Sequence, residues 1–277
     1  DALLQTLNGA ASITVNNQFS LYRYAAFFGR INYQLNSRYI LNLTGRRDGS
    51  TKFGPGRQWG SFGAIGAAWI FSSEGFASKF KNWLSFGKIR LSYGSSGNDQ
   101  LANYQYMDGW GVQSNPYQSV PGIAPARLFN PKYSWELSRK MEAGLELGFF
   151  NNKILSEISF YRHRSGNQLV QYALPAQTGF TSIIANLPAL IQNTGIELSI
   201  QAKIIDRTNL KWSLNGVVTL PHNKLLSFPD LETSSYATSY VIGEPLTLLY
   251  SYLFTGIDST TGVYRFQDIN NDGKYTR

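Results

Sequence analysis

The residues best suited to bind an ion lie in the stretch Asp268–Gly273, close to the end of the sequence. Asp268, Asn270 and Asp272 place three oxygen ligands at alternate positions before a glycine that permits a sharp turn, as in the first half of an EF-hand loop. The sequence therefore predicts a calcium site, with the backbone carbonyl of Lys274 as a further ligand. The twelfth-position carboxylate has no counterpart and no helix flanks the loop, so a polar turn between strands is the alternative interpretation.

Groups that could catalyse a reaction are few and badly spaced. The histidines are His163 and His222, and neither belongs to an HExxH zinc motif or stands at a recognisable spacing from a serine and an aspartate. Glu142 and Glu146 fall on one face of a predicted strand, which favours a structural or pore-lining role over glycoside hydrolysis. The sequence contains no phosphate-binding loop and no dinucleotide fingerprint. We therefore predict that the chain is not an enzyme.

The composition narrows the class of protein further. The 277 residues include no cysteine, which excludes a disulfide framework and a thiolate metal site. The formal net charge is +8, but lysine and arginine are scattered and form no block. Nucleic-acid binding is therefore not predicted, since a barrel lumen or a rim facing anionic lipid accounts for these charges equally well. No run of 18 apolar residues is present, so no transmembrane helix is expected.

The elements that must position these residues are strands, because apolar and polar residues alternate along most of the chain. Eight strands of about ten residues are predicted at 26–35, 39–47, 59–70, 86–94, 136–149, 154–164, 195–204 and 210–220. A helix of one or two turns is predicted over 72–82. Short connections at 36–38, 151–153 and 206–209 alternate with long loops at 47–58, 95–134, 165–190 and from 221 onward.

This alternation of short and long connections is typical of an outer-membrane barrel, and large aromatic residues gather beside the short turns as in an interfacial girdle. A soluble antiparallel sandwich is the alternative fold, but its strands average about 5–6 residues and its loops are shorter. We therefore predict an all-β, antiparallel transmembrane β-barrel of the outer-membrane type, present as a partial barrel with long loops.

The strand pattern also assigns the two faces. The residues predicted to face lipid are apolar: Leu41, Leu43, Leu145, Leu147, Ile196, Leu198, Ile200, Leu214 and Val218. The residues predicted to face the lumen are polar: Lys88, Arg90, Lys140, Glu142, Glu197, Gln201 and Lys203.

Six stretches carry a resemblance to a known family. They are Gly29–Tyr33, Arg46–Phe53, Lys88–Asn98, Asn193–Leu198, Gly243–Leu246 and Asp268–Gly273. In order and spacing they resemble the SusC/RagA-like branch of TonB-dependent outer-membrane transporters. Any one of these stretches is a weak signal, and their order across nearly the whole chain makes the signal specific.

The resemblance implies that residues 1–277 are an internal part of one transporter barrel, with the plug domain and the final barrel strands outside the chain. It implies import of large nutrients, glycans or peptides, across the bacterial outer membrane. Its partners would be outer-membrane lipid, a SusD-like surface lipoprotein that lids the barrel, and TonB, which binds a part of the protein absent from this chain. A secreted soluble β-rich glycan-binding module is the alternative function.

In that setting the long loops face outward and the short turns face the periplasm. The aromatic residues predicted to contact ligand or lid lie in these loops: Trp110, Tyr117, Tyr133, Tyr172, Tyr236 and Tyr240. Aromatic faces stack on sugar rings and are frequent in protein interfaces, although the same residues could merely pack the loops together.

Overall fold

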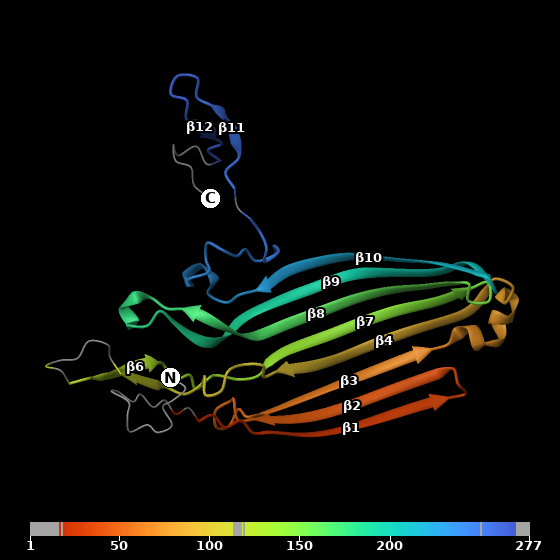
Figure 1. The fold of residues 1–277 in the computed structure, drawn as a ribbon, viewed down its shortest axis with the longest axis horizontal. Coiled ribbons are helices and arrows are strands. Elements are labelled where there is room, and N and C mark those ends of the chain that lie inside the picture. The colour runs from red at the N-terminus through yellow and green to blue at the C-terminus, as the bar shows by residue number, and fades with distance from the viewer. Residues whose placement is uncertain (1–16, 18, 113–117, 119, 250, 270–277) are drawn as a thin grey trace, which may run out of the picture.

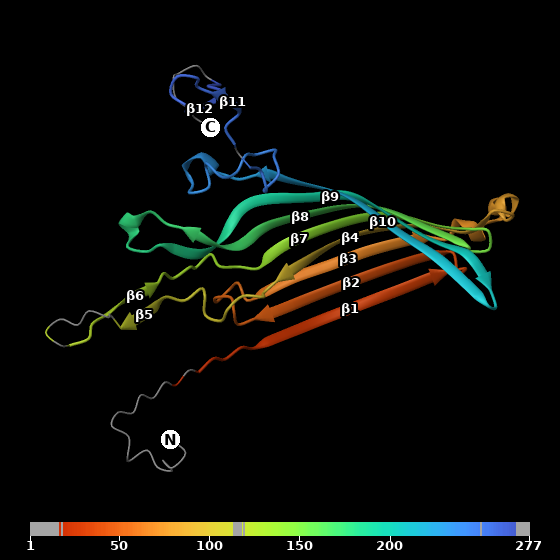
Figure 2. The same cartoon turned by 45° about the horizontal axis from the view of Figure 1, so that its top comes forward.

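The computed structural model describes residues 17, 19–112, 118, 120–249 and 251–269, and most of them form a single curved sheet (Figures 1 and 2). The sheet has eight antiparallel strands in the order β1-β2-β3-β4-β7-β8-β9-β10. Their bounds are β1 Tyr24–Leu35, β2 Tyr39–Ser50, β3 Trp59–Trp69, β4 Leu84–Asn98, β7 Glu136–Phe149, β8 Ile154–Ala173, β9 Ser182–Arg207 and β10 Leu210–Ser227. The eight predicted strands are thus confirmed.

Smaller elements occupy the connections. Two hairpins are formed by β5 (Gly109–Val112) with β6 (Ile123–Arg127), and by β11 (Phe254–Ile257) with β12 (Tyr264–Phe266). The described part of the chain also contains the short 3-10 helices η2 Phe71–Ser73, η3 Gly75–Phe80, η4 Ala176–Thr178 and η5 Leu231–Thr233. Among the described residues no helix has the length and apolar character to cross a membrane.

The three predicted short connections are confirmed as tight turns, but the strict alternation of short and long connections is not, because residues 70–83 between β3 and β4 form a longer connection than residues 51–58 between β2 and β3. The turns between β1 and β2, β7 and β8, and β9 and β10 lie at one end of the sheet together with η2 and η3, which we call the short-turn end (Figure 1). The β5–β6 hairpin, the tip of the β8–β9 hairpin and the segment after β10 lie at the opposite end, the loop end. Asn36 and Ser37 adopt positive φ angles of 50° and 53°, as a tight hairpin turn between twisted strands requires.

Several predicted boundaries were wrong. The predicted loop at 165–190 is a continuation of the β8–β9 hairpin, in which Gln168–Ala173 pairs with Ser182–Leu187. Strand β2 extends to Ser50, and β10 passes Pro221 and ends at Ser227. In the β8–β9 extension and at the end of β10, backbone pairing continues although the apolar alternation stops, because residues there pack on a local apolar cluster. The cluster is made of Leu187, Ala189, Ile191, Leu225 and Phe228.

The two faces of the sheet differ sharply in character, and the register confirms the predicted division of residues between them. Directly paired residues share a face, so one row on the first face runs Leu41, Ala67, Leu91, Ala143, Phe160, Ile196 and Leu220 from β2 to β10. The adjacent row on the other face runs Asn42, Gly66, Ser92, Glu142, Tyr161 and Gly195. We call these faces the apolar face and the polar face.

Many large side chains of the apolar face are exposed to solvent in this structure. Among the described residues β1 pairs only with β2 and β10 pairs along its length only with β9, so the sheet has two free edges. An exposed apolar face and free edges are both what an incomplete barrel presents.

The predicted helix over 72–82 was also wrong in type. It consists of η2 and η3, separated by Glu74 in an extended conformation with φ −81° and ψ 155°. Residues 71–83 instead form a ledge that folds back onto the apolar face at the short-turn end. The ring of Phe71 covers Gly87, where an added Cβ would lie 2.3 Å from the ring. We refer to residues 71–83 as the ledge.

Glu74 fixes the ledge to the strand ends. Its carboxylate accepts hydrogen bonds from the Tyr39 hydroxyl at 2.7 Å and from Trp69 Nε1 at 3.2 Å. Arg38 completes the set with an ion pair at 3.0 Å. Tyr39 and Trp69 are directly paired residues of the apolar face, so the ledge lies on the outer side of that rim.

The division into two faces predicts an asymmetric response to a new positive charge. In the full-length protein, Leu198→Arg would place arginine in the middle of the apolar face, between Ile158 and Val218. If this face lies against lipid, the substitution lowers the free energy of unfolding by about 2–4 kcal/mol. Gln201→Arg, on the polar face of the same strand, leaves it nearly unchanged. Urea titration of the protein in lipid vesicles measures both, and equal mild effects would contradict the assignment.

A second prediction concerns pH. Hydrogen bonds from Tyr39 and then Trp69, together with the charge of Arg38, hold the pKa of Glu74 below its usual range. A lowered carboxyl pKa stabilises the fold above the unfolded-state pKa, and this contribution is lost as pH falls through the folded-state pKa. The unfolding midpoint in urea should therefore fall more steeply below about pH 4.3 in the wild-type protein than in Glu74→Gln. Parallel pH profiles for the two proteins would show that the ledge does not depend on this charge.

Candidate functional site

A network of ion pairs occupies the middle of the polar face. Arg90 on β4 contacts Glu142 and Glu157 through its two terminal nitrogens, and its Nε lies 3.3 Å from Glu146. Lys88 contacts the same Glu146 at 3.0 Å. The guanidinium lies across Gly144, where an added Cβ would lie 2.6 Å from Arg90 Nε. The glycine thus allows one arginine on β4 to reach carboxylates on both β7 and β8.

The network carries more negative than positive charge. Three carboxylates share two cations, and the side chains retain between 24% and 42% of their exposure to solvent. Water therefore screens the pairs, and each is weaker than a fully buried pair. Such a charged, hydrated surface suits a water-filled passage better than a packed core.

A groove of about 750 Å³ lies on the polar face between this network and the loop end. Its surface is about half polar and half apolar, and its lining residues include Glu142, Ser159, Tyr161, His163, Asn193, Glu197, Asn223, Pro245 and Thr247. The volume falls within the range of small-molecule sites, about 300–1,000 Å³. We call it the lumen groove.

Tyr161 and its neighbours give the lumen groove its shape. The Tyr161 ring lies over Gly195, where an added Cβ would lie 2.5 Å from the hydroxyl oxygen. The ring of His163 follows at a centroid distance of 5.1 Å. Asn223 donates to the side-chain oxygen of Asn193 at 2.6 Å. The arrangement combines an aromatic face with amide, imidazole and carboxylate groups, which can bind the hydroxyl or amide groups of a polar ligand.

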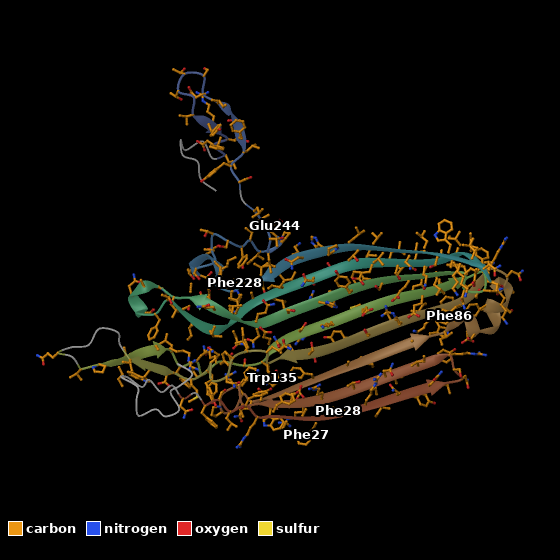
Figure 3. All side chains as sticks on the ribbon, viewed as in Figure 1. Phe27, Phe28, Phe86, Trp135, Phe228 and Glu244 are labelled. Atoms are coloured by element: carbon orange, nitrogen blue, oxygen red, sulfur yellow. The ribbon has the colours of Figure 1, made fainter. Side chains whose placement is uncertain are left out.

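The segment Gly243–Thr247 borders the lumen groove at the end of β10. Gly243 N donates to the Leu225 carbonyl at 2.8 Å, and Leu225 N donates to the Glu244 carbonyl at 2.9 Å. The N–H of Leu246 donates to Asn223 Oδ1 at 2.9 Å. Figure 3 shows Glu244 beside the end of β10. These bonds place Pro245 and Thr247 in the groove wall.

Three of the aromatic residues predicted to contact ligand or lid come together at the loop end. Tyr236 lies 5.7 Å from Tyr172 and 5.6 Å from Tyr240, measured between ring centroids. Phe228 lies 6.0 Å from Tyr236 and joins this group to the apolar cluster beneath it. Burial raises the pKa of the Tyr236 hydroxyl. All three tyrosines are only partly buried, so each still presents an edge to solvent.

The other predicted aromatic residues lie apart from this group. Trp110 on β5 is 62% exposed, and Tyr117 lies outside the described residues. Tyr133 is completely buried and packs against Phe53, 5.7 Å away between ring centroids. The Trp135 ring packs against the same phenylalanine at a centroid distance of 4.7 Å and a tilt of 33°, at the loop end of the sheet (Figure 3). Burial raises the pKa of Tyr133 to about 12, and its hydroxyl has no hydrogen-bond partner among the described residues.

The described residues include only part of the predicted set of calcium ligands. Asp268 belongs to the described residues, whereas Asn270 and Asp272 lie outside them. Elsewhere in the described part of the chain, no three His, Cys, Asp or Glu side chains are grouped to hold a metal ion. Calcium binding at Asp268–Gly273 remains a prediction.

Sequence reasoning did not identify the lumen groove. It placed Glu142 and Glu197 on the lumen face, but Tyr161 and Asn193 became neighbours only through the β8–β9 register. The available signal was the alternation that places Tyr161 and His163 on the polar face of β8. The glycine that Tyr161 covers, Gly195, lies on the neighbouring strand β9. Without the register that pattern does not show which residue faces the glycine.

Comparison with known proteins identifies the fold. A family described as TonB dependent receptor-like, beta-barrel matches residues 2–275. TonB-dependent receptor P26 of Formosa agariphila is 30% identical over 287 residues, covering 94% of this chain and 28% of that protein. TonB-dependent receptor SusC of Bacteroides thetaiotaomicron is 30% identical over 218 residues, covering 76% of this chain and 22% of that protein. The chain therefore spans about a quarter of the length of these relatives.

Solved structures give the same result. The RagAB peptide importer in its "closed-closed" state has a TM-score of 0.79 and 26% identity, covering 91% of this chain and 28% of that one. A further structure of the RagAB peptide transporter has a TM-score of 0.77 and 25% identity, with the same coverage. The predicted fold class is confirmed: an antiparallel transmembrane β-barrel of the outer-membrane type, represented here by an open part of its wall.

The ion-pair network predicts a measurable loss of stability when Arg90, the cation shared by its carboxylates, is replaced. Arg90→Gln leaves Glu142 and Glu157 without their common partner and should lower the free energy of unfolding of the full-length protein by about 1–2 kcal/mol, discounted for solvent screening. Glu197→Gln is the matched control, because Glu197 lies on the same face and forms no ion pair among the described residues. An equal loss in both variants, measured by urea titration, would contradict the network.

Removal of the buried Tyr133 hydroxyl is predicted to leave the stability of the protein unchanged or to raise it. A buried polar group without a partner costs about 1–3 kcal/mol, so Tyr133→Phe should leave stability unchanged or raise it by up to about 1 kcal/mol. Tyr133→Ala, which removes the ring from its contact with Phe53, should destabilise the loop end and expose it to protease. A clear loss of stability in Tyr133→Phe would show that the hydroxyl has a partner in the intact protein.

Proposed function

The chain belongs to the TonB dependent receptor-like β-barrel family, and from this premise we propose that it forms part of the barrel wall of a transporter that imports large nutrients across the bacterial outer membrane. Within the family it is similar to SusC/RagA-like members. In this role the chain is a conduit and catalyses no reaction.

The observation that carries the proposal is the continuity of the two faces across eight strands. The apolar face fits the hydrocarbon of a bilayer, because its rows of leucine, isoleucine and aromatic residues are interrupted by few polar side chains at mid-strand. The polar face, with the Arg90 network and the lumen groove, fits a water-filled lumen. Outer-membrane lipid is thus the first partner of the chain.

The nutrients we propose are glycans or peptides. One relative is named a peptide importer, and the lumen groove combines an aromatic face with amide and carboxylate groups that bind either class. Ligand would enter at the loop end, past Trp110 and the cluster of Tyr172, Tyr236 and Tyr240. Tyr117 and Tyr133 belong to the same loops.

Transport in this family takes its energy from TonB, and we propose that TonB binds a part of the full-length protein outside this chain. A SusD-like surface lipoprotein would cover the loop end as a lid. This assignment places the long loops at the cell surface and the short turns in the periplasm. Calcium at Asp268–Gly273 would stiffen one of the surface loops.

The test begins with the full-length protein in its own cells. It should fractionate with the outer membrane, require detergent for extraction and change gel mobility on heating. Cells that carry it should take up labelled oligosaccharides or oligopeptides only when the TonB complex is energised. A soluble, heat-insensitive protein would support the secreted glycan-binding module instead and refute the transporter.

The lumen groove supplies a specific prediction within this test. Loss of one aromatic contact costs about 0.5–1.5 kcal/mol, so Tyr161→Ala should weaken binding of the imported oligomer by about 2–10-fold. Tyr161→Phe retains the ring over Gly195 and should bind nearly as the wild type does. Isothermal titration of the purified transporter measures this, with gel mobility on heating as the control for folding. Unchanged affinity in Tyr161→Ala would exclude the groove from the ligand path.

A further inference from the structure

The ledge, residues 71–83, is an exposed aromatic and basic segment on the apolar face. Phe76 is 54% exposed, Trp83 46% and Phe80 43%, whereas Ala77 between them is buried. Trp83 stacks on Phe149 with a centroid distance of 5.8 Å and an interplanar angle of 8°. Phe149 belongs to the apolar face of β7 through its pairing with Ile154. The aromatic groups of the ledge therefore continue the apolar face beyond the ends of the strands.

Positive charge accompanies these rings. Lys79 and Lys81 lie within the ledge, and Lys153 lies in the neighbouring turn, where Phe150 N donates to the Trp83 carbonyl at 2.9 Å. All three lysines are exposed, and none forms an ion pair with the described residues. The carboxylate of the ledge, Glu74, is already held by Arg38, Tyr39 and Trp69. The ledge thus presents unneutralised positive charge beside exposed aromatic rings.

We propose that the ledge binds the phosphate headgroups of anionic phospholipid in the leaflet at the short-turn end of the barrel. Phe76, Phe80 and Trp83 lie at the boundary between headgroups and acyl chains, where aromatic side chains are favoured. Lys79 and Lys81 reach the phosphates, with Lys153 beside them. This inference rests on the proposed function only in requiring that the apolar face contact lipid.

Two features favour lipid over a protein partner as the occupant. The ledge lies on the same face as the rows of Leu145, Ile158 and Leu198, so any occupant must be continuous with the bilayer that covers them. The positive charge of the ledge also matches an anionic membrane surface. Each lysine near such a surface contributes about 1 kcal/mol to the free energy of membrane binding.

The experiment uses the full-length transporter in nanodiscs of phosphatidylethanolamine and phosphatidylglycerol. Photoreactive p-benzoylphenylalanine is introduced at Phe80, a conservative replacement of one aromatic ring by another. Irradiation should add the mass of one phospholipid to the protein, with phosphatidylglycerol preferred over its share of the bilayer. Lys79→Gln combined with Lys81→Gln should reduce that preference, by about fivefold for each lysine.

Lys132→Gln is the matched control, since Lys132 is an exposed lysine at the loop end, and it should leave the preference unchanged. Crosslinking of the ledge to protein rather than lipid, or an unchanged lipid preference in the double variant, would overturn the inference. Gel mobility on heating separates this outcome from failure of the proposed function. A heat-modifiable barrel without lipid preference refutes only the headgroup site, whereas a protein that never enters the nanodisc refutes both.

Discussion

The structure depends on the requirement that every backbone N–H and C=O group inside a bilayer finds a partner within the protein. The sheet meets it by the simplest topology, in which strands adjacent in sequence are also neighbours in space, apart from the β5–β6 excursion between β4 and β7. The register then keeps residues of like polarity in rows across all eight strands. A slip of one residue between any two strands would exchange the faces of everything beyond it. Among the described residues the outer edges of β1 and β10 pair with no further strand of this sheet, as expected of an incomplete barrel.

Strict pairing also explains where glycine is used on the polar face. Gly144 allows the Arg90 guanidinium to lie flat across β7, and Gly195 allows the Tyr161 ring to lie across β9. In both places a large side chain on one strand covers the bare backbone of the next. The ion-pair network and the lumen groove are therefore consequences of two small residues at defined positions of the register. On the apolar face Gly87 has the same relation to Phe71, which holds the ledge against the sheet.

Much of this architecture could be predicted from the sequence because the side-chain period of a strand is visible in it. The alternation of Ile196, Leu198 and Ile200 with Glu197 and Gln201 determines both the strand and its faces. The predictions that were wrong or missing concern features that depend on which residues lie next to each other in the folded sheet. The extension of β8 to Ala173 has no clear alternation and is held by its pairing with β9. The ledge was predicted as one helix, because the spacing of Phe76 and Phe80 suits a helix. The contacts of Glu74 with Tyr39 and Trp69 cannot be read from the sequence. The neighbours of Tyr161 likewise follow only from the register.

The central claim is that the apolar face contacts lipid and the polar face lines a hydrated lumen. Its most direct test is a nitroxide scan of β9, residue by residue from Gly195 to Lys203, in the full-length transporter reconstituted in lipid. The chain described here contains no cysteine to complicate labelling. Collisions with oxygen should be frequent at Ile196, Leu198 and Ile200, and collisions with a water-soluble nickel complex should be frequent at Glu197, Ser199 and Gln201. A profile without this period of two, or with its phase reversed, would contradict the account.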